Sequence, residues 1–457
     1  MVGFMQPAMS SPLRLLLLFQ GMWEDECVEA LRRERTLEVF REGVESCGYP
    51  QVFRLLRFDA VRWADELAAR YRGRIDAVWS NDDQFGCLLA AMIAQRLGLP
   101  GADPQAIVRA QHKLLLRERL AAAMPQHSVR AVALPWPLQH ARSRDAAAIG
   151  AAVAAAGLQW PLFAKPVKGT FSALARKVVD ASELAAHLSL PRLDRWLWQW
   201  HARPFAQLAR SVAELPCGPD HVLLEQPMAG HQVNVDGYAF AGDVHVLGVV
   251  DELMYPGEVQ GAHHFAGFTL PSRLPVTLQQ RVADVAAQAI RAIGYDHGLF
   301  NVELFVDRDG AVRVIEVNPR SAGQFATLYR AVRGIDLERI AIQLAAGQSP
   351  DAVPKHAPWA GAAASFVFRR FDGRAGRTPA AQDLAWLGNT HPQSRLWTEP
   401  CSRAARRREY RWLGSHRYAV WNHAAKDFAT LFADGSETAR RLFGAELPPA
   451  PAPVWRE

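Results

Sequence analysis

The sequence predicts a protein of mixed α/β and α+β class, and three features support this prediction. Strand and helix patterns alternate over the first hundred residues. Two later segments, 160–179 and 299–320, have the pattern of strand–turn–strand hairpins that carry charged side chains among apolar ones. A proline-rich stretch that begins at residue 351 marks a boundary before a shorter C-terminal part. At about 100–200 residues per domain, 457 residues hold about three domains.

The composition is that of a globular protein with a sizeable core. Apolar residues make up 49% of the chain, and the net charge is +6 with a pI near 9.2. A nucleic-acid-binding protein usually clusters its positive charge, whereas here only the run from Arg403 to Arg411 is dense. We therefore expect no nucleic-acid partner. The run from Arg403 to Arg411 is the one feature that favours such a partner. A basic surface also suits anionic nucleotide substrates.

Five cysteines are scattered along the chain, and no Cys-x-x-Cys pair occurs. This pattern predicts a reducing compartment, the cytoplasm, and argues against a disulfide framework or a zinc site. The run Leu15–Phe19 follows Arg14 but is too short for the apolar core of a signal peptide, so we interpret it as a buried strand. No segment is long enough to span a membrane, and no membrane partner is expected.

The first hundred residues are expected to form an open, doubly wound parallel sheet. The expected elements are strand Leu13–Phe19, helix Cys27–Cys47 ended by Gly48, weak strand Val52–Leu56, helix Val61–Tyr71, strand Ile75–Trp79 and helix Gln84–Leu97 ended by Gly98. Ligands of such sheets bind at the carboxyl ends of the strands. Asn81, Asp82 and Asp83 lie at such an end, so they either contact a substrate or, for the two acids, cap the following helix.

The first of the two hairpins carries a lysine. Lys165 lies near the end of the strand Trp160–Pro166, and a buried lysine needs an anionic partner because its charge cannot be desolvated alone. A loop follows, and then a strand at Ala173–Val179. The loop offers backbone N–H and hydroxyl groups that can fold over phosphates, from Gly169, Thr170 and Ser172.

Periodicity assigns the elements around that hairpin. They are helices at Gln111–Met124 (with Lys113), at 137–158 and after Asp180 or Ser182, strands at His221–Gly230, His231–Phe240 and Val244–Asp251, and helix Leu278–Ile293. Trp196, Trp198 and Trp200 are interpreted as a packing surface, with an acceptor pocket as the alternative. A segment with Glu258, His263 and His264 is expected to contact substrate, because the spacing of a metal site is missing.

The second hairpin places two acids among apolar neighbours. Its strands, 299–306 and 311–320, are joined by a turn in which Gly310 is free to adopt a positive φ. Neighbouring strands lie roughly 5 Å apart, so Glu303 and Glu316 would repel each other if both are buried. Two carboxylates, the amide oxygen of Asn318 and phosphate oxygens suit Mg²⁺. The alternative is a plain hairpin with two exposed acids.

The ending Glu-Val-Asn-Pro-Arg at 316–320, together with the lysine hairpin upstream, resembles the ATP-grasp superfamily, above all its carboxylate–amine ligases such as L-amino-acid ligases. The resemblance covers roughly residues 75–350. It implies an ATP-grasp fold that uses ATP and two Mg²⁺. Glu303, Glu316 and Asn318 match the family's magnesium ligands, and Arg320 matches its arginine near the transferred phosphate and the substrate carboxylate.

The same resemblance assigns the nucleotide contacts. Lys113 and Lys165 match the lysines on the phosphates, with Lys165 and Arg320 taken as catalytic, and Gly169–Ser172 match the flexible loop. The adenine and ribose positions correspond to Glu225, Gln226, Met228 and Gln232. The chain departs from the family in three places. The loop has one glycine rather than two or three, Phe171 replaces a small residue, and Gln232 replaces the acid for the ribose hydroxyls.

The reaction implied is ligation. A substrate carboxylate attacks the γ-phosphate of ATP, giving an acyl phosphate and ADP, and an amine then displaces phosphate. Small-molecule carboxylate and amine substrates and a possible homodimer follow from the same resemblance. No Gly-x-x-x-x-Gly-Lys-Ser/Thr loop occurs, which removes a common rival ATP site. The alternatives are a biotin-carboxylase-like enzyme and a catalytically silent nucleotide-binding regulatory protein.

The expected division has five parts. They are an N-terminal α/β domain (1–110), a helical linker (111–160), a small lid subdomain (161–230), a large subdomain with the metal site (231–350), and a C-terminal α+β cap with a tail (351–457). Within the cap we expect strands Ala362–Phe368 and Glu409–Val420, helices Ala424–Phe432 and Ala439–Phe443, and an extended tail from Leu447.

Overall fold

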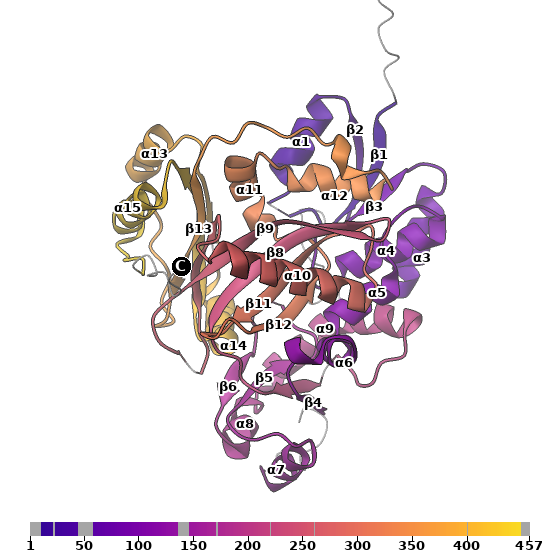
Figure 1. The fold of residues 1–457 in the computed structure, drawn as a ribbon, viewed down its shortest axis with the longest axis vertical. Helices are drawn as coiled ribbons and strands as arrows, with labels where there is room; N and C mark the ends of the chain where they lie inside the picture. Colours follow the sequence, from indigo (N-terminus) through magenta and orange to yellow (C-terminus); the bar gives the residue numbers. More distant parts are fainter. Residues whose placement is uncertain are drawn as a thin grey trace, which may run out of the picture.

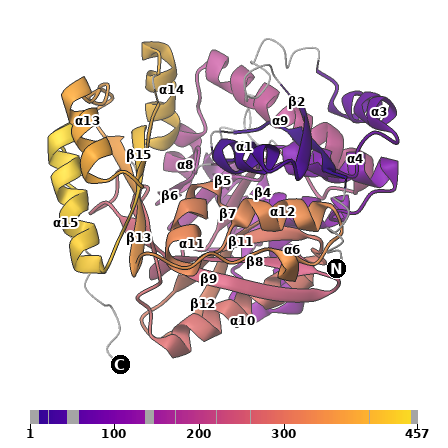
Figure 2. The same ribbon diagram turned by 90° about the horizontal axis from the view of Figure 1, so that it is seen from above.

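The computed structural model describes residues 11–21, 23–43, 58–135, 146–170, 172–219, 221–259, 261–399 and 401–448. These residues build three β-sheets, of three, four and eight strands (Figure 1, Figure 2). In Figure 1 the N-terminal sheet (indigo) lies at the upper right, the four-stranded sheet (magenta) at the bottom, and the C-terminal helices (yellow) at the left. The mixed α/β and α+β class predicted from the sequence is confirmed.

The N-terminal sheet is parallel, as predicted. Strand β1 (Leu13–Leu18) lies between β2 (Leu37–Glu42) and β3 (Ala77–Trp79), and it is buried because helices cover both faces. Helices α3 (Ala60–Tyr71) and α4 (Gly86–Leu97) pack on one face. Helix α1 (Asp25–Arg33) packs on the other.

The helix expected over Cys27–Cys47 is wrong in its second half. Helix α1 ends at Arg33, Arg35 adopts a positive φ of 58°, and the chain then enters β2. Pairing with β1 along six residues, from Leu37 to Glu42, outweighs the helical spacing of the apolar side chains. The weak strand expected at Val52–Leu56 lies outside the described residues.

The four-stranded sheet is antiparallel and forms a separate lobe. Its order is β4 (Ala131–Leu134), β7 (Val222–Glu225), β5 (Leu162–Pro166) and β6 (Arg176–Val178). Helices α7 (Ala146–Ala155) and α8 (Ala181–His187) share its core. The chain reaches this lobe through α5 (Pro104–Gln111) and α6 (Lys113–Ala123), and leaves α8 through α9 (Arg192–Val212). The single helix expected at Gln111–Met124 is divided at His112, which caps α6 and places Lys113 in its first turn.

The eight-stranded sheet forms the centre of the molecule. Its order is β12 (Val312–Asn318), β11 (Gly298–Val306), β8 (His231–Phe240), β9 (Asp243–Met254), β10 (Phe265–Leu270), β13 (Ala362–Arg370), β15 (His416–Ala425) and β14 (Arg395–Thr398). Helix α10 (Val276–Ile293) packs on one face. Helices α11 (Ala326–Arg333) and α12 (Leu337–Ala345) pack on the other, where α12 also contacts β3 and so joins the large sheet to the N-terminal one.

The C-terminal part has α+β content, as expected, but its strands extend the large sheet instead of forming a sheet of their own. The strand expected at Glu409–Val420 is wrong at its start, because α14 (Arg403–Leu413) runs to Gly414. The helix expected from Ala424 begins later, as α15 (Phe428–Thr438) with Asp427 as its cap. Helix α13 (Ala381–Thr390) and strand β14 were not expected. A π-helical turn at Ala439–Phe443 matches the last expected helix.

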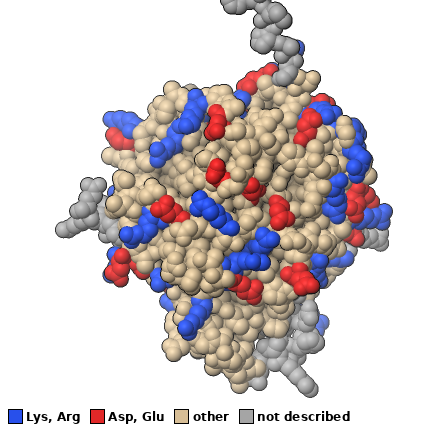
Figure 3. Space-filling view, turned by 45° about the vertical axis from the view of Figure 1, so that its right-hand side comes forward, with Lys and Arg blue, Asp and Glu red and all other residues tan. Residues whose placement is uncertain are grey.

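Charged side chains are dispersed over the surface. On the face in Figure 3 basic and acidic residues intermingle. The arginine run of α14 is partly used in contacts, since Arg408 and Arg411 pair with Asp194 of α9 and Arg406 donates to the Gly373 carbonyl. Among the described helices, none combines the length and apolar character needed to cross a bilayer.

Candidate functional site

The hairpin β11–β12 brings the two predicted metal-ligand acids together. Glu303 and Glu316 are paired directly across the two strands, and Asn301 pairs with Asn318. The Asn318 amide donates to Glu303 Oε1 (3.2 Å) and to Asn301 Oδ1 (3.2 Å). Gly310 in the turn has φ +76°, as predicted.

A third acid, Glu252 of β9, lies close enough to Glu303 to affect the pKa of that residue. Burial raises the pKa of Glu252 to about 7, while Asn234 donates to its Oε1 at 2.6 Å. Burial, together with the charges of Glu316 and Glu252, raises the pKa of Glu303 well above its ordinary value. If all three acids were ionised, they would carry more negative charge than the neighbouring groups compensate. Their hard oxygen donors fit a divalent cation such as Mg²⁺.

Lys113 links the helical linker to these acids. Its Nζ lies 2.6 Å from Glu316 Oε2 and donates to the Gly169 carbonyl at 3.2 Å. Burial alone would raise the pKa of Glu316, but the charges of Lys113 and Lys165 lower it. Lys113 thus contacts both the candidate metal ligands and the candidate phosphate loop.

Lys165 has its anionic partner within the small lobe. Its Nζ lies 2.6 Å from Glu225 Oε1, and Arg117 Nε lies 2.8 Å from Glu225 Oε2. The three side chains are 5%, 0% and 4% exposed. Burial alone would raise the pKa of Glu225, but Arg117 and Lys165 hold it at about 2. The carboxylate predicted to contact adenine is therefore engaged in orienting Lys165.

Arg117 was not predicted, although it connects the two lobes. It donates to the carbonyls of Val314 (2.6 Å) and Ile315 (2.8 Å) on β12 as well as to Glu225 on β7. Because Arg117 is followed by Glu118 and Arg119, nothing in the sequence distinguished it from a residue on an exposed helix face.

The predicted phosphate loop is held at several points. Thr170 Oγ1 donates to Gln84 Oε1 at 3.4 Å, and Ser172 adopts a positive φ of 56°. Just beyond, the Leu174 N–H donates to the Trp412 carbonyl of α14 at 2.8 Å. Phe171 lies outside the described residues.

Helix α14 contacts the small lobe at a second place. The Trp412 ring packs edge-on against Trp198 of α9 at 5.5 Å, and Trp198 belongs to the core of the lobe. Arg411 and Arg408 pair with the buried Asp194 at the start of α9. The tryptophan-rich segment therefore includes a packing surface, as preferred from the sequence, and part of its partner comes from the C-terminal region.

Of the two interpretations of the acids after β3, the helix cap is confirmed for Asp82, whereas contact with a substrate stays a prediction. Asp82 caps α4, accepting from the N–H groups of Phe85 (3.1 Å) and Gly86 (2.8 Å). Asp83 instead pairs with Arg320, whose NH2 lies 3.1 Å from its Oδ2. The carboxyl end of the N-terminal sheet thus meets the end of β12.

Lys168 is a further cation that received no role in the sequence analysis. It is buried, donates to the Asp83 carbonyl at 2.7 Å, and lies 4.7 Å from the centre of the Phe205 ring. Burial lowers its pKa to about 8. Although burial alone would raise the pKa of Asp83, the charges of Arg320 and Lys168 hold it below its ordinary value.

The predicted adenine and ribose positions lie at the junction of the two lobes. The Gln226 N–H donates to the Arg130 carbonyl at 3.2 Å, and Gln226 is exposed, whereas Met228 is half-buried. Gln232 on β8 hydrogen-bonds Glu252. An acid, Glu252, therefore lies beside position 232 on the neighbouring strand β9.

The segment with Glu258, His263 and His264 does not form a metal site. Glu258 lies 3.4 Å from both Lys177 Nζ and His263 Nε2 at the surface. His264 is buried, and its Nδ1 lies 3.3 Å from Ser415 Oγ. The two histidines have different partners, and their expected contact with substrate stays a prediction.

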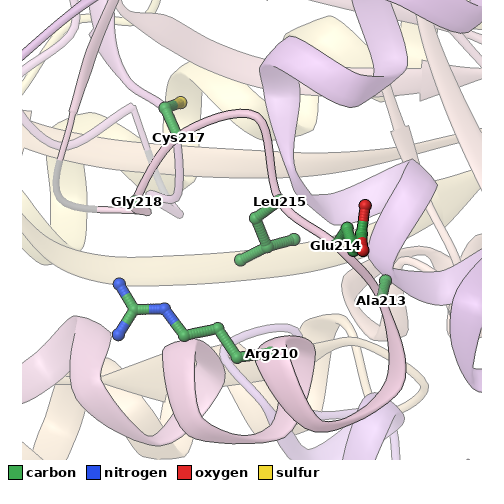
Figure 4. Close-up of a pocket in the computed structure, with 6 residues that line it drawn as sticks. All are labelled: Arg210, Ala213, Glu214, Leu215, Cys217 and Gly218. Carbon is green, nitrogen blue, oxygen red and sulfur yellow. The ribbon is translucent and has the colours of Figure 1, made fainter.

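One cavity lies away from these groups. It has a volume of about 530 Å³ and is lined by Arg210, Ala213, Glu214, Leu215, Cys217 and Gly218 (Figure 4). A narrow cavity of about 60 Å³ lies behind the site, where Arg320, Ser321 and Cys87 are part of its wall.

Comparison with known proteins agrees with the predicted family. A family model described as an ATP-grasp domain matches residues 158–328. Carnosine synthase 1 from Gallus gallus is 30% identical over 301 residues, which are 63% of this chain and 29% of that protein. The chain spans less than half the length of the curated relatives it matches.

Solved structures share the fold. The L-amino acid ligase from Bacillus licheniformis superposes with a TM-score of 0.68 at 16% identity, covering 95% of this chain and 98% of that one. The biotin carboxylase domain of 2-oxoglutarate carboxylase from Hydrogenobacter thermophilus, solved with MgADP and bicarbonate, gives 0.60 at 13% identity, covering 94% and 90%. The overall fold expected from the sequence is thereby confirmed.

Proposed function

We propose that the chain belongs to the ATP-grasp superfamily and is an ATP-dependent ligase that joins a substrate carboxylate to an amine. The matched domain, residues 158–328, contains both the lysine hairpin and the acidic hairpin. The relative named carnosine synthase 1 and the structural neighbour named an L-amino acid ligase support this reaction type.

One observation carries the proposal. The directly paired Glu303 and Glu316 face a lysine from the other side of the site, since Lys113 contacts Glu316. Glu303, Glu316 and Asn318 would hold Mg²⁺, which when bound neutralises charge on the phosphates of ATP. The raised pKa of Glu303 supports the need for such a cation.

The basic residues around the acids have distinct roles in this proposal. Lys113 and Lys165 bind the phosphates, and the loop with Gly169, Thr170 and Ser172 covers them. Arg320, held by Asp83, stabilises the charge on the transferred phosphoryl group and orients the substrate carboxylate. Gln226 and Met228 bind adenine, and Gln232 with Glu252 binds the ribose hydroxyls.

The chemistry needs no covalent intermediate on the protein. A carboxylate oxygen of the substrate attacks the γ-phosphorus, the bond to the β-phosphate oxygen breaks, and ADP leaves. The amine nitrogen then attacks the acyl carbon of the acyl phosphate. Phosphate leaves, a proton is released from nitrogen, and an amide forms.

We further propose that the substrates are amino acids or a natural-product precursor, and that the enzyme acts in the cytoplasm, possibly as a homodimer. The name of carnosine synthase supports an amino-acid amine, and the four described cysteines, all free thiols, suit a reducing compartment. A biotin-carboxylase-like reaction is favoured only by the fold, which both classes share.

The test is nucleotide turnover with amino acids offered singly and in pairs, and with bicarbonate. ADP and phosphate formed only with particular pairs, and lost in Glu316→Gln, would support the ligase. Release of AMP and pyrophosphate would contradict the acyl phosphate, and turnover that requires bicarbonate would favour the alternative. Asp309→Asn, at the exposed tip of the same hairpin, is the matched control and should turn over normally.

A further inference from the structure

Three potential metal ligands converge in the C-terminal part, outside the site described above. His391 follows the end of α13, His423 lies on β15, and Asp434 lies on α15. Their ligand atoms all lie within 4.8 Å of one another. They come from three elements that are separated in sequence, so their meeting is a product of the tertiary fold.

The three side chains leave one buried nitrogen without a partner. His423 Nε2 lies 2.9 Å from Asp434 Oδ2, and the rings of His391 and His423 are 4.5 Å apart. His391 Nε2 is inaccessible to solvent and has no hydrogen-bond partner within the described part of the chain. A buried polar atom without a partner is destabilising, so a ligand at this point would be stabilising.

Aromatic packing holds both imidazoles in place. The Trp421 ring stacks on His423 at 4.7 Å with an interplanar angle of 9°, and Trp386 packs edge-on against His391 at 5.7 Å. Rings fixed by packing lose little entropy when they bind an ion.

We propose that His391, His423 and Asp434 bind a zinc ion. Two imidazole nitrogens and a carboxylate oxygen are a donor set that zinc accepts, and the partial exposure of His391 and Asp434 leaves room for a water as fourth ligand. Zinc bonds of about 2.0–2.1 Å place tetrahedral ligand atoms about 3.3 Å apart, so the atoms must approach by at most about 1.5 Å. Small side-chain rotations supply this, and the His423–Asp434 hydrogen bond is replaced by the ion. The lack of a Cys-x-x-Cys pair argued against a cysteine-based zinc site. It says nothing about a site made of histidines and an aspartate.

The position of the site indicates what the ion would do. It would tie α13 and α15 to one face of β15. On the opposite face, the neighbouring Asn422 donates to the Gln324 carbonyl (2.8 Å) and to Thr327 Oγ1 (2.7 Å), just beyond the hairpin that carries Arg320. The zinc would therefore stabilise the strand on which the Gln324 segment rests, without contacting substrate.

The experiment uses the untagged full chain, treated with a chelator and dialysed into excess Mg²⁺ so that the acidic hairpin does not compete. Zn²⁺ is titrated while the melting temperature is followed, and Co²⁺ is titrated while visible d–d absorption is followed. We expect one equivalent of either ion, a rise in melting temperature of several degrees, and a tetrahedral Co²⁺ spectrum.

Variants locate the ion. His391→Ala should abolish the Co²⁺ spectrum and the zinc-dependent rise, and that rise is measured against the metal-free form of the same variant, because the ring packing of His391 is lost as well. Asp434→Asn should weaken Zn²⁺ binding at least tenfold. Cys401→Ser tests the other nearby cluster, Cys401 with Glu409 and His416, and should bind as the parent does. Binding that persists in His391→Ala, binding lost in Cys401→Ser, or no uptake at micromolar Zn²⁺ would each overturn the proposal.

Discussion

The two lobes around the candidate site differ in the sign of their charge. The small-sheet side contributes Lys165 and, through α6, Lys113, whereas the large sheet contributes Glu303 and Glu316. The two lysines are held differently. Lys165 pairs within its own lobe, with a fully buried Glu225, but Lys113 pairs across the site with Glu316, which is 23% exposed. We infer that Lys165 is part of the architecture of the small lobe, whereas Lys113 can exchange Glu316 for another partner.

The largest effect should come from the acidic side. We expect Glu316→Gln to lower the rate of ADP formation about a thousandfold, because metal-based charge stabilisation contributes several kcal/mol and each 1.4 kcal/mol is tenfold in rate. Steady-state assays at saturating ATP and Mg²⁺ measure this. Asp309→Asn serves as the control, and a fall of less than tenfold in Glu316→Gln would remove that residue from the metal site.

The next prediction tests the contrast between the lysines. Lys165→Met should destabilise the fold by about 3 kcal/mol, because it leaves a buried carboxylate with one partner fewer. Lys113→Met should change stability by no more than about 1 kcal/mol, because its partner reaches water. Both variants, Lys165→Met and Lys113→Met, should lose most of the ligase activity. Urea unfolding gives the stabilities, with the exposed Lys355→Met as the matched control.

Equal loss of stability in Lys113→Met and Lys165→Met would show that both pairs are architectural. The two lysines should also differ in their effect on Mg²⁺ binding. If Mg²⁺ and Lys113 compete for Glu316, Lys113→Met should bind Mg²⁺ more tightly in the absence of nucleotide, and titration calorimetry without ATP would detect this.

Sequence patterns found the charged residues that interrupt apolar strands. Lys165, Glu303 and Glu316 stood out because a charge in a buried strand needs a chemical reason, and the direct pairing of the two acids follows from their hairpin. Pairings across long stretches of chain were invisible. Arg320 meets Asp83 from 237 residues away, and nothing local to either residue indicates it.

The same limit explains the errors in the fold. Residues 37–42 repeat their apolar side chains at helical spacing, and only the adjacent β1 turns them into a strand. The end of helix α14, from Glu409 to Leu413, was predicted as strand because these residues were considered without the lobe that the helix contacts. In both places a partner distant in sequence decided the local structure.

The contact between α14 and the small lobe predicts a smaller effect. Trp412→Ala should raise the KM for ATP about fivefold to tenfold with little change in kcat, because an aromatic pair contributes about 0.5–1.5 kcal/mol beyond its buried area and Trp198 loses that partner. The phosphate loop, anchored nearby at Leu174, would then close less readily. Arg407→Ala, on the exposed side of the same helix, should leave the KM unchanged. A change confined to kcat would assign α14 to another step.

The smallest effect concerns the ribose position, where the acid has moved from β8 to β9. Gln232→Glu alone should raise the KM for ATP about threefold, because it sets a second carboxylate beside Glu252, whose pKa is already raised to about 7 by burial. The double variant Gln232→Glu with Glu252→Gln exchanges the two groups and should return the KM to within about twofold of the parent. Such recovery would show that the two positions act as one acid–amide pair. Additive losses in the double variant would instead mean that Glu252 belongs with Glu303 and Glu316 on the metal side, and the acidic lobe would then hold three candidate ligands rather than two.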